Sequence, residues 1–432
     1  MKTVIQKSRR TARLFAVVLT LCLILTLLPA GLAAQPAQAG ARPAESTASQ
    51  AAWLAAYYDL TLDKEFANME AYTQALMMLQ PAHGQRELAS ANPAWGVGAL
   101  DAVKYAVIAA NMQELALVYT PAKIDRALRS ADADGIDADY APYVACALDL
   151  GMITPAQAKM AKTNSQADVA FTCSLLMAVA DVNGVSRNYL GYSDDPDIYA
   201  RFINACEAFI LFDDPALSVI GSEAVMQQVT TGYSLKSDAY NARFLPALTL
   251  VYGHSDVRHA VQILGLLQSE GIVAKVQFEP KVSIYQYLPE WGDPGEPTST
   301  YAVRTINSDL MLAYATEYDM ILEFSNKEDM DKLDALIVNY AKKNSGEEGK
   351  ALLSGSWWQP LYYARVEMDG DYFMLYDNVI TNGTYSLHPF CLEEEKANVL
   401  ASFLSIDPDM DIVQVPIWCN AAFHRYLNGI AE

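Results

Sequence analysis

The amino-terminal half of the chain repeats apolar residues at intervals of three and four. The pattern is clearest in AAWLAAYYDL (51–60), MEAYTQALMML (69–79) and ALDAVKYAVIAANMQELALVY (99–119). This spacing places the apolar side chains on one face of an α-helix. Strand-type alternation is scarce before about residue 235. We therefore expect residues 40–240 to form a helical domain.

A weak internal repeat runs through this half. KYAVIAANMQEL (104–115) aligns with PYVACALDLGMI (142–153), and each is followed by Thr-Pro-Ala, at 120–122 and 154–156. Threonine as the N-cap with proline at the first helical position is a physical helix start. The repeat predicts helix–loop–helix units with a period of roughly 35–40 residues, which bury their apolar faces against one another.

After about residue 244, short strand-like runs alternate with helical ones. ALTLVY (247–252) predicts a strand, VRHAVQILGLL (257–267) a helix, and IVAKVQF (272–278) a strand with one well-buried face. YDMILEF (318–324) precedes a second helical pattern that starts with a capping box at Ser325 and Glu328. These units predict ferredoxin-like βαβ packing.

The later part of this half adds strands and further helices. LYYARVE (361–367) and DYFMLYDNVI (371–380) flank Asp369-Gly370, a hairpin turn signal. We therefore expect residues 241–432 to form an α+β domain. The predicted fold class is an all-α helical bundle followed by this α+β domain of βαβ units.

Residues 1–39 have the pattern of a secretory signal peptide. A basic start precedes an apolar run at 14–28, and Ala37-Gln38-Ala39 predicts cleavage before Gly40. The run is shorter than the roughly 20 residues that span a membrane, and no later segment is long and apolar enough. The sequence therefore predicts a secreted protein, at the cell surface or in the cell wall, without a membrane span after cleavage.

Charge and cysteine content exclude several classes of partner. The chain has 30 basic and 51 acidic residues, and loss of five basic residues with the signal leaves a net charge of −26. Without a basic run, so acidic a protein does not hold a nucleic-acid backbone. No CxxC pair is present, which argues against structural zinc. We expect no nucleic-acid partner and no metal or other cofactor, with calcium as a weak alternative.

Residues 137–183 resemble the S-layer homology module. The resemblance is carried by APYVACALDLGMI (141–153), a variable loop, and SQADVAFTCSLLMAVADV (165–182). It implies bundled helical modules that hold an exported bacterial protein non-covalently to secondary polymers of a Gram-positive-type cell wall, or to its peptidoglycan. The alternative is a degenerate bundle whose helices only pack against one another.

The module's short motif, typically Thr-Arg-Ala-Glu, corresponds here to Ser165-Gln166-Ala167-Asp168. Its polymer-contacting arginine is replaced by Gln166, and Lys159 and Lys162 are the nearby cations that would substitute. The resemblance therefore nominates the following wall-polymer residues: Ser165, Gln166, Asp168, Lys159 and Lys162.

The acidic loop ADADGIDADYAP (131–142) is loosely similar to calcium loops, which array carboxylates around a glycine turn. Its candidate ligands are Asp132, Asp134, Asp137 and Asp139. The EF-hand spacing fails because no glutamate stands at its twelfth position. A solvated loop between helices is the favoured interpretation.

The stretch YGHSDVRHA (252–260) holds two of five histidines. Ser255 predicts a helix N-cap. His254 and His259, taken on one helix, lie about 140° out of phase, so the rings are not expected to converge on a metal. In open α/β sheets, ligands bind at the turn that follows the carboxyl end of a strand, and the start of the next helix favours anions. His254 and Ser255 lie at such a turn and are therefore candidate ligand contacts.

Tryptophans suggest a second candidate ligand surface. Trp291 lies in a loop rich in proline and glycine (290–300), and Trp357 and Trp358 belong to the cluster GSWWQPLYY (355–363). Aromatic rings stack on sugars or peptides, but they also form ordinary core. The sequence leaves both roles open.

No motif nominates a catalytic residue. GxSxG, HExxH and phosphate-cradling glycine loops do not occur in the chain. We therefore favour a wall-associated, non-enzymatic protein that presents a binding or assembly domain. The alternative is a secreted enzyme that acts on cell-wall glycan or peptide, with its site in the carboxy-terminal half.

Overall fold

The computed structural model describes residues 45–81, 85–88, 92–163, 165–340, 361–428 and 430. The expected signal peptide, Trp357 and Trp358 lie outside these residues. In the part of the chain that the structure describes, no helix is both long enough and apolar enough to cross a membrane.

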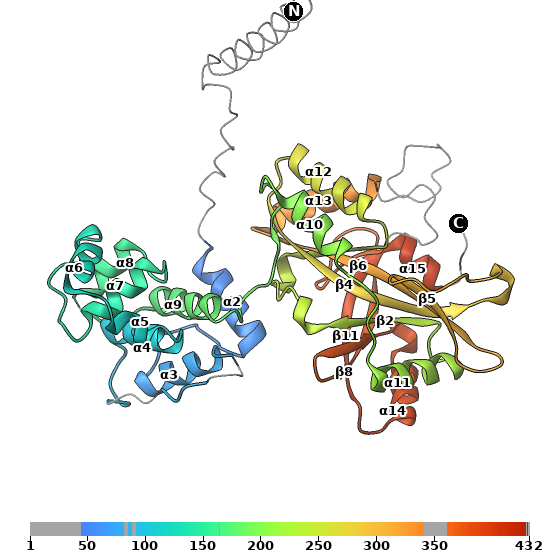
Figure 1. The fold of residues 1–432 in the computed structure, drawn as a ribbon, viewed down its shortest axis with the longest axis horizontal. Helices are drawn as coiled ribbons and strands as arrows, with labels where there is room; N and C mark the ends of the chain where they lie inside the picture. Colours follow the sequence, from blue (N-terminus) through green and yellow to red (C-terminus); the bar gives the residue numbers. More distant parts are fainter. Residues whose placement is uncertain are drawn as a thin grey trace, which may run out of the picture. The chain divides into compact units, whose positions relative to one another are not determined.

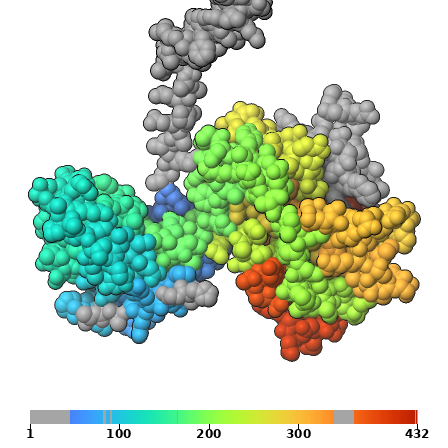
Figure 2. All heavy atoms as spheres, in the orientation of Figure 1, coloured from blue at the N-terminus to red at the C-terminus, as the bar shows by residue number. Residues whose placement is uncertain are grey.

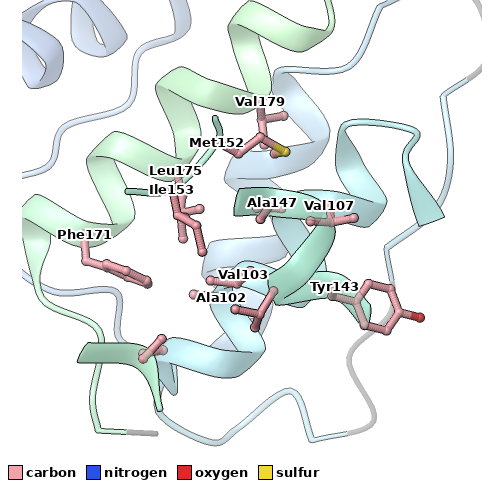
Figure 3. Packing of buried hydrophobic residues seen from close by; sticks show 14 of the residues in the cluster. Ala102, Val103, Val107, Tyr143, Ala147, Met152, Ile153, Phe171, Leu175 and Val179 are labelled. Atoms are coloured by element: carbon pink, nitrogen blue, oxygen red, sulfur yellow. The ribbon is translucent and has the colours of Figure 1, made fainter. Parts of the chain in front are cut away.

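The first helices share a hydrophobic core of their own. Their bounds are α2 (Thr47–Tyr58), α3 (Met69–Met78), α4 (Ala99–Ala109), α5 (Gln113–Leu117), α6 (Pro121–Ser130), α7 (Ala141–Asp149), α8 (Pro155–Ala161) and α9 (Val169–Val182). Figure 3 shows Val103 and Val107 of α4 with Leu175 and Val179 of α9 inside this core. These side chains recur every three or four residues, which explains why they share one face.

Two helix starts follow the predicted threonine–proline signal. The Thr120 hydroxyl accepts from the Lys123 amide at 3.4 Å, with Pro121 beginning α6. The Thr154 hydroxyl accepts from the Gln157 amide at 3.2 Å, and the Gln157 side chain accepts from the Thr154 amide at 2.8 Å. The predicted starts at 120 and 154 are confirmed, because such caps satisfy otherwise unpaired amides.

The strands form one antiparallel sheet. Their bounds are β1 (Gly191–Tyr192), β2 (Gly232–Ser237), β3 (Thr249–His254), β4 (Ala274–Tyr287), β5 (Tyr301–Thr305), β6 (Met311–Phe324), β7 (Leu361–Ala364), β8 (Tyr372–Asn382), β9 (Tyr385–His388), β10 (Phe390–Leu392) and β11 (Asp411–Asn420). The order β4-β2-β9-β8-β11-β7-β3-β6 closes because β6 also pairs with β4. Within the described residues this is a closed eight-stranded barrel, to which β1, β5 and β10 add.

The remaining helices cover the outside of the barrel and one of its ends. They are α10 (Ile198–Glu207), α11 (Pro215–Met226), α12 (Val257–Ser269), α13 (Lys327–Tyr340), α14 (Lys396–Ile406) and α15 (Ala421–Leu427), with short 3₁₀ turns at Asp238–Tyr240, Pro246–Leu248, Pro289–Trp291 and Glu393–Glu395. Helices α10, α12 and α13 share one outer core with the strands (Figure 1). Helices α11 and α14 share another, and Figure 2 shows their green and red atoms in contact.

The fold class predicted from the sequence is wrong. β3 and β4 flank α12, but they are not neighbours: β3 pairs with β6 and β7, and β4 with β2 and β6, all antiparallel. A βαβ unit needs parallel strands, so the barrel contains none here. Helices α10 and α11 also pack against the barrel instead of joining one long bundle.

The predicted hairpin through Asp369-Gly370 is wrong as well. Gly370 does turn the chain with a φ of +101°, but β7 and β8 do not pair with each other. β11 lies between them and pairs with both. Turn chemistry fixes a local bend, whereas the partner of a strand depends on distant parts of the chain.

The inward face of the barrel is partly charged. Successive side chains of a strand alternate between faces, and the outward ones join the cores under the helices. The buried polar side chains of the inward face include Lys236, Gln277, Glu279, Lys281, Asp319 and Glu323. Apolar side chains of β3, β7 and β11 fill the opposite part of the lumen, with Phe423 of α15 against them.

Candidate functional site

The S-layer-like motif lies in a connection held against another loop. The Ala99 amide donates to the Ser165 carbonyl at 2.9 Å, and the Ala167 amide to the Val97 carbonyl at 2.8 Å. Asp168 caps α9 by accepting from the Phe171 amide at 2.8 Å. Gln166 is exposed beside Gly96, where an added Cβ would come within 2.6 Å of the glutamine Oε1.

The nominated lysines and the acidic loop contact each other. Lys159 Nζ lies 3.4 Å from Asp132, and Lys162 Nζ lies 3.9 Å from Asp134, both at exposed positions. The Asp137 carboxylate accepts from the Asp139 amide at 2.9 Å. The lysines nominated for polymer binding and two of the aspartates nominated for calcium binding therefore already form ion pairs with one another.

Metal binding has no further support in the structure. Among the residues that the structure describes, no group of three or more histidine, cysteine, aspartate or glutamate side chains is arranged to hold an ion. Two histidines do come together, but without a third ligand.

The two histidines that come together are His254 and His259. Their rings stack, with centroids 4.1 Å apart and an angle of 30° between their planes. The rings stack although residues five apart on one helix lie about 140° out of phase, because His254 lies outside the helix. His254 ends β3, and the cap of α12 is Asp256, whose carboxylate accepts from the Arg258 amide at 2.9 Å, in place of Ser255.

The histidine pair is neutral at pH 7. Burial lowers the pKa of His254 to about 4, with a smaller contribution in the same direction from His259. Burial likewise lowers the pKa of His259. The Asp256 amide donates to Nδ1 of His254 at 2.8 Å, so the ring proton lies on Nε2.

Three nominated ligand residues line one cavity, which we call the aromatic cavity. His254, Ser255 and Trp291 border this space of about 410 Å³. Its other lining residues include Ser234, Lys281, Ser283, Tyr285, Glu317, His388, Phe390, Phe423 and Tyr426. The tertiary structure thus brings together residues from β3, β4, β6 and α15 that are far apart in the sequence.

Aromatic rings and polar groups divide the lining of this cavity. Trp291 meets Tyr287 edge to face at 5.3 Å, and the Tyr287 hydroxyl donates to the Gly292 carbonyl at 3.0 Å. The indole is nevertheless 41 % exposed. The Ser283 hydroxyl donates to Glu317 at 2.6 Å. An aromatic surface therefore accompanies a carboxyl group and a hydroxyl group.

Glu317 is easier to protonate than an ordinary glutamate. Burial raises its pKa, against the opposing effects of Lys281 and the Ser283 hydrogen bond. A carboxyl in this state accepts hydrogen bonds when ionised and donates one when protonated.

A charged network lies next to the aromatic cavity in the lumen. Lys236 Nζ is 2.7 Å from Glu279 and 2.6 Å from Asp319, and Lys281 Nζ is 2.6 Å from the other oxygen of Asp319. Burial alone would raise the pKa of Asp319, but the two ammonium groups outweigh burial and hold that pKa well below its usual range.

A second cavity, which we call the polar cavity, borders the same network at Lys236 and Glu279. It measures about 320 Å³, and His388 lines both cavities. Its lining includes Lys236, Ser237, Glu279, Tyr363, Arg365, Asp377, Val379, Ser386, Val415 and Ile417.

Three of these residues form a hydrogen-bonded chain. Ser386 Oγ lies 2.8 Å from Nε2 of His388, and Nδ1 of His388 lies 2.9 Å from Asp377. Sequence reasoning missed this group because no GxSxG motif surrounds the serine and the aspartate comes from another strand. The only local signal is the spacing of Ser386 and His388, which places both on one face of β9.

Comparisons of the chain with family models, with curated proteins and with solved structures found no match. Both cavities are therefore interpreted from the chemistry of their own residues.

Proposed function

We propose that this protein is exported, associates with the cell wall through its helical part, and binds a saccharide fragment of that wall in the aromatic cavity. The observation that carries the proposal is the composition of that cavity, which combines the exposed face of Trp291 with the polar groups of Ser283 and Glu317.

The chemistry of a sugar suits this combination. One face of a pyranose ring is apolar and stacks on an aromatic ring, while its hydroxyl groups need hydrogen-bond partners. Trp291 and Tyr426 provide the aromatic surface, and Glu317 and Ser283 provide the partners. The volume of about 410 Å³ lies within the range of small-molecule pockets, roughly 300–1,000 Å³.

Charge favours an uncharged saccharide over an anionic ligand. Among the described residues that line the aromatic cavity, the single lysine is Lys281, which already pairs with Asp319 at 2.6 Å. The mature chain is strongly acidic, so an anion also meets an unfavourable long-range field.

Wall association is the second part of the proposal, and it follows from the resemblance of residues 137–183 to the S-layer homology module. It is tested by sedimenting the mature chain with isolated Gram-positive-type walls, before and after acid removal of their secondary polymers. We expect co-sedimentation that disappears on extraction. A chain that stays in solution with both wall samples contradicts this part.

Saccharide binding is tested by calorimetric titration of the mature chain with N,N′-diacetylchitobiose, an uncharged disaccharide of the N-acetylglucosamine that wall glycan contains. Trp291→Ala should weaken binding by about tenfold, which corresponds to about 1.4 kcal/mol. Trp95→Ala is the matched control, because Trp95 is 66 % exposed in the helical part, outside the cavity. Equal affinities for the two variants, or no heat with the unaltered chain, contradict the assignment.

A further inference from the structure

We propose that Ser386, His388 and Asp377 form a nucleophilic site in the polar cavity, which hydrolyses carboxylic esters of small acyl groups. This activity goes beyond saccharide binding and uses a different cavity. The proposal stands on the two hydrogen bonds, 2.8 Å and 2.9 Å, that link the three side chains in the order a serine hydrolase requires.

The strand register directs these side chains into the lumen. Leu387 lies between Ser386 and His388 in β9 and is buried in the outer core, so its two neighbours face the other way. Ser386 is paired directly with Lys236 of β2, whose ammonium group is buried in the lumen network. Hydroxyl and imidazole therefore open onto the polar cavity.

Each member of the group has a distinct role. With Nδ1 of His388 facing the Asp377 carboxylate, the ring proton lies on Nδ1, and Nε2 is free to accept the proton of Ser386. His388 is thus the general base, and Asp377 is a positioning residue. The second oxygen of Asp377 is buried without a hydrogen-bond partner in the described part of the chain, so the histidine is the main partner of this carboxylate.

The reaction is a two-step acyl transfer. Ser386 Oγ forms a bond to the ester carbonyl carbon while its proton moves to His388 Nε2, and the carbon–alkoxy bond then breaks as that proton passes to the departing alkoxide. Water next attacks the acyl-serine, gives a proton to Nε2, and releases the carboxylic acid as the proton returns to Oγ. One ester and one water become one acid and one alcohol.

Positive charge lies where the reaction needs it. The carbonyl oxygen becomes negative during attack, and preorganised cationic or N–H groups stabilise that charge. Arg365 lines the polar cavity and is the cation that we assign to this role, because Lys236, the cross-strand neighbour of Ser386, already pairs with Glu279 and Asp319. The cavity of about 320 Å³ is at the small end for ligand pockets, and Val379, Val415 and Ile417 give it an apolar wall. These dimensions select a short acyl chain.

The first test needs no variant. The mature chain is treated with a fluorophosphonate probe, and the modified residue is located by mass spectrometry of its peptides. We expect labelling at Ser386 together with hydrolysis of p-nitrophenyl acetate. A folded chain that carries no label at Ser386 overturns the proposal.

Substitutions then separate catalysis from packing. Ser386→Ala should abolish the label and lower kcat/KM for p-nitrophenyl acetate by about 100-fold or more, the usual contribution of such groups. Ser405→Ala, on the exposed side of α14 and outside both cavities, is the matched control and should leave both readouts unchanged. Hydrolysis that survives Ser386→Ala overturns the proposal.

The proposed role of Asp377, to position His388, is tested with two substitutions. Asp377→Asn should lower kcat by about 100-fold or more while KM stays unchanged, and Asp377→Glu should recover part of kcat. A loss of kcat that the glutamate variant does not relieve contradicts the positioning role. Trp291→Ala should leave ester hydrolysis intact, so this proposal and saccharide binding fail independently.

Discussion

The ammonium group of Lys236 lies 2.6 Å from the carboxylate of Asp319 inside the barrel, and both side chains are almost completely buried. Glu279 and Lys281 extend the contact to two positive and two negative groups. A charge removed from water is tolerated only with a partner, so the network stabilises the barrel only when it is complete.

Lys236→Met should therefore lower the free energy of unfolding by about 3–5 kcal/mol, the range for breaking a buried ion pair by removing one partner. The substitution preserves volume but leaves Glu279 and Asp319 short of a counter-charge. Urea denaturation at pH 7 measures the change.

Lys327→Met is the control for this measurement. Lys327 pairs with Asp331 at 2.8 Å on the exposed face of α13, where such pairs contribute about 0–1 kcal/mol. Similar losses in the two variants would contradict a special role for the lumen network.

Arg187 should be the most sensitive ionic contact between the first helices and the barrel. Its guanidinium binds Glu323 of β6 at 2.9 Å and Glu45 at 2.6 Å, and lies over the ring of Trp53. Arg187→Ala should lower the free energy of unfolding by about 3 kcal/mol or more. Arg187→Lys should restore little, because an ammonium group cannot reproduce the fork of donors.

Thermal and urea unfolding check this prediction, with Arg201→Ala as the control. Arg201 pairs with Asp197 at 2.9 Å but also donates to the Leu190 carbonyl at 2.7 Å, so its loss should change stability by less than the loss of Arg187 does. If Arg187→Lys were as stable as the unaltered chain, a positive charge at this position would be sufficient and the shape of the guanidinium would not matter.

His254 should make the protein less stable as the pH falls. Its pKa is about 4 in the folded chain, whereas an unfolded histidine takes up a proton near its ordinary value of about 6.5. The unfolded state therefore binds more protons between these values, and stability falls as the pH drops from about 6.5 to 4. The full effect is about 3 kcal/mol.

The measurement is the unfolding free energy of the unaltered chain and of His254→Gln from pH 8 to pH 4. The glutamine should accept from the Asp256 amide and remove most of the slope due to this site. His259, Asp256 and Lys281 also act on His254, so some slope remains. Parallel curves for the two proteins would contradict the assignment.

Glu317 should have the opposite effect on stability. Its pKa is raised in the folded state by burial, so its contribution to stability is complete below the ordinary pKa of a glutamate and is lost as the pH rises through the folded pKa. Glu317→Gln should keep a bond from Ser283 and be more stable at pH 8 by about 1 kcal/mol. Melting curves at pH 4 and pH 8 measure this gain, which should vanish at the lower pH.

Local rules explain what the sequence predicted well. Thr120 and Thr154 begin helices because a hydroxyl beside free amides needs no distant partner. The strand around 274–278 was predictable because apolar alternation follows from the strand backbone itself, and the strand around 249–254 because a short apolar run is typical of a buried strand. The same rules placed Ser255 at a helix start and Trp291 in a loop, but they do not show that the two share a cavity.

Only the tertiary structure decided whether the polar side chains of the strands face solvent or the interior of the barrel. Lys275, Gln277 and Glu279 alternate with apolar residues as they would on a strand with one face in water. Pairing of β4 with β6 closes the barrel and turns that face into a buried lumen. The same closure joins Asp377 of β8 to His388 and Ser386 of β9. The sequence determined the positions of many helices and strands along the chain and the apolar face of each, because both depend on residues that are close together in the sequence. Strand partners and the two cavities depend on contacts between distant segments, which local patterns do not encode.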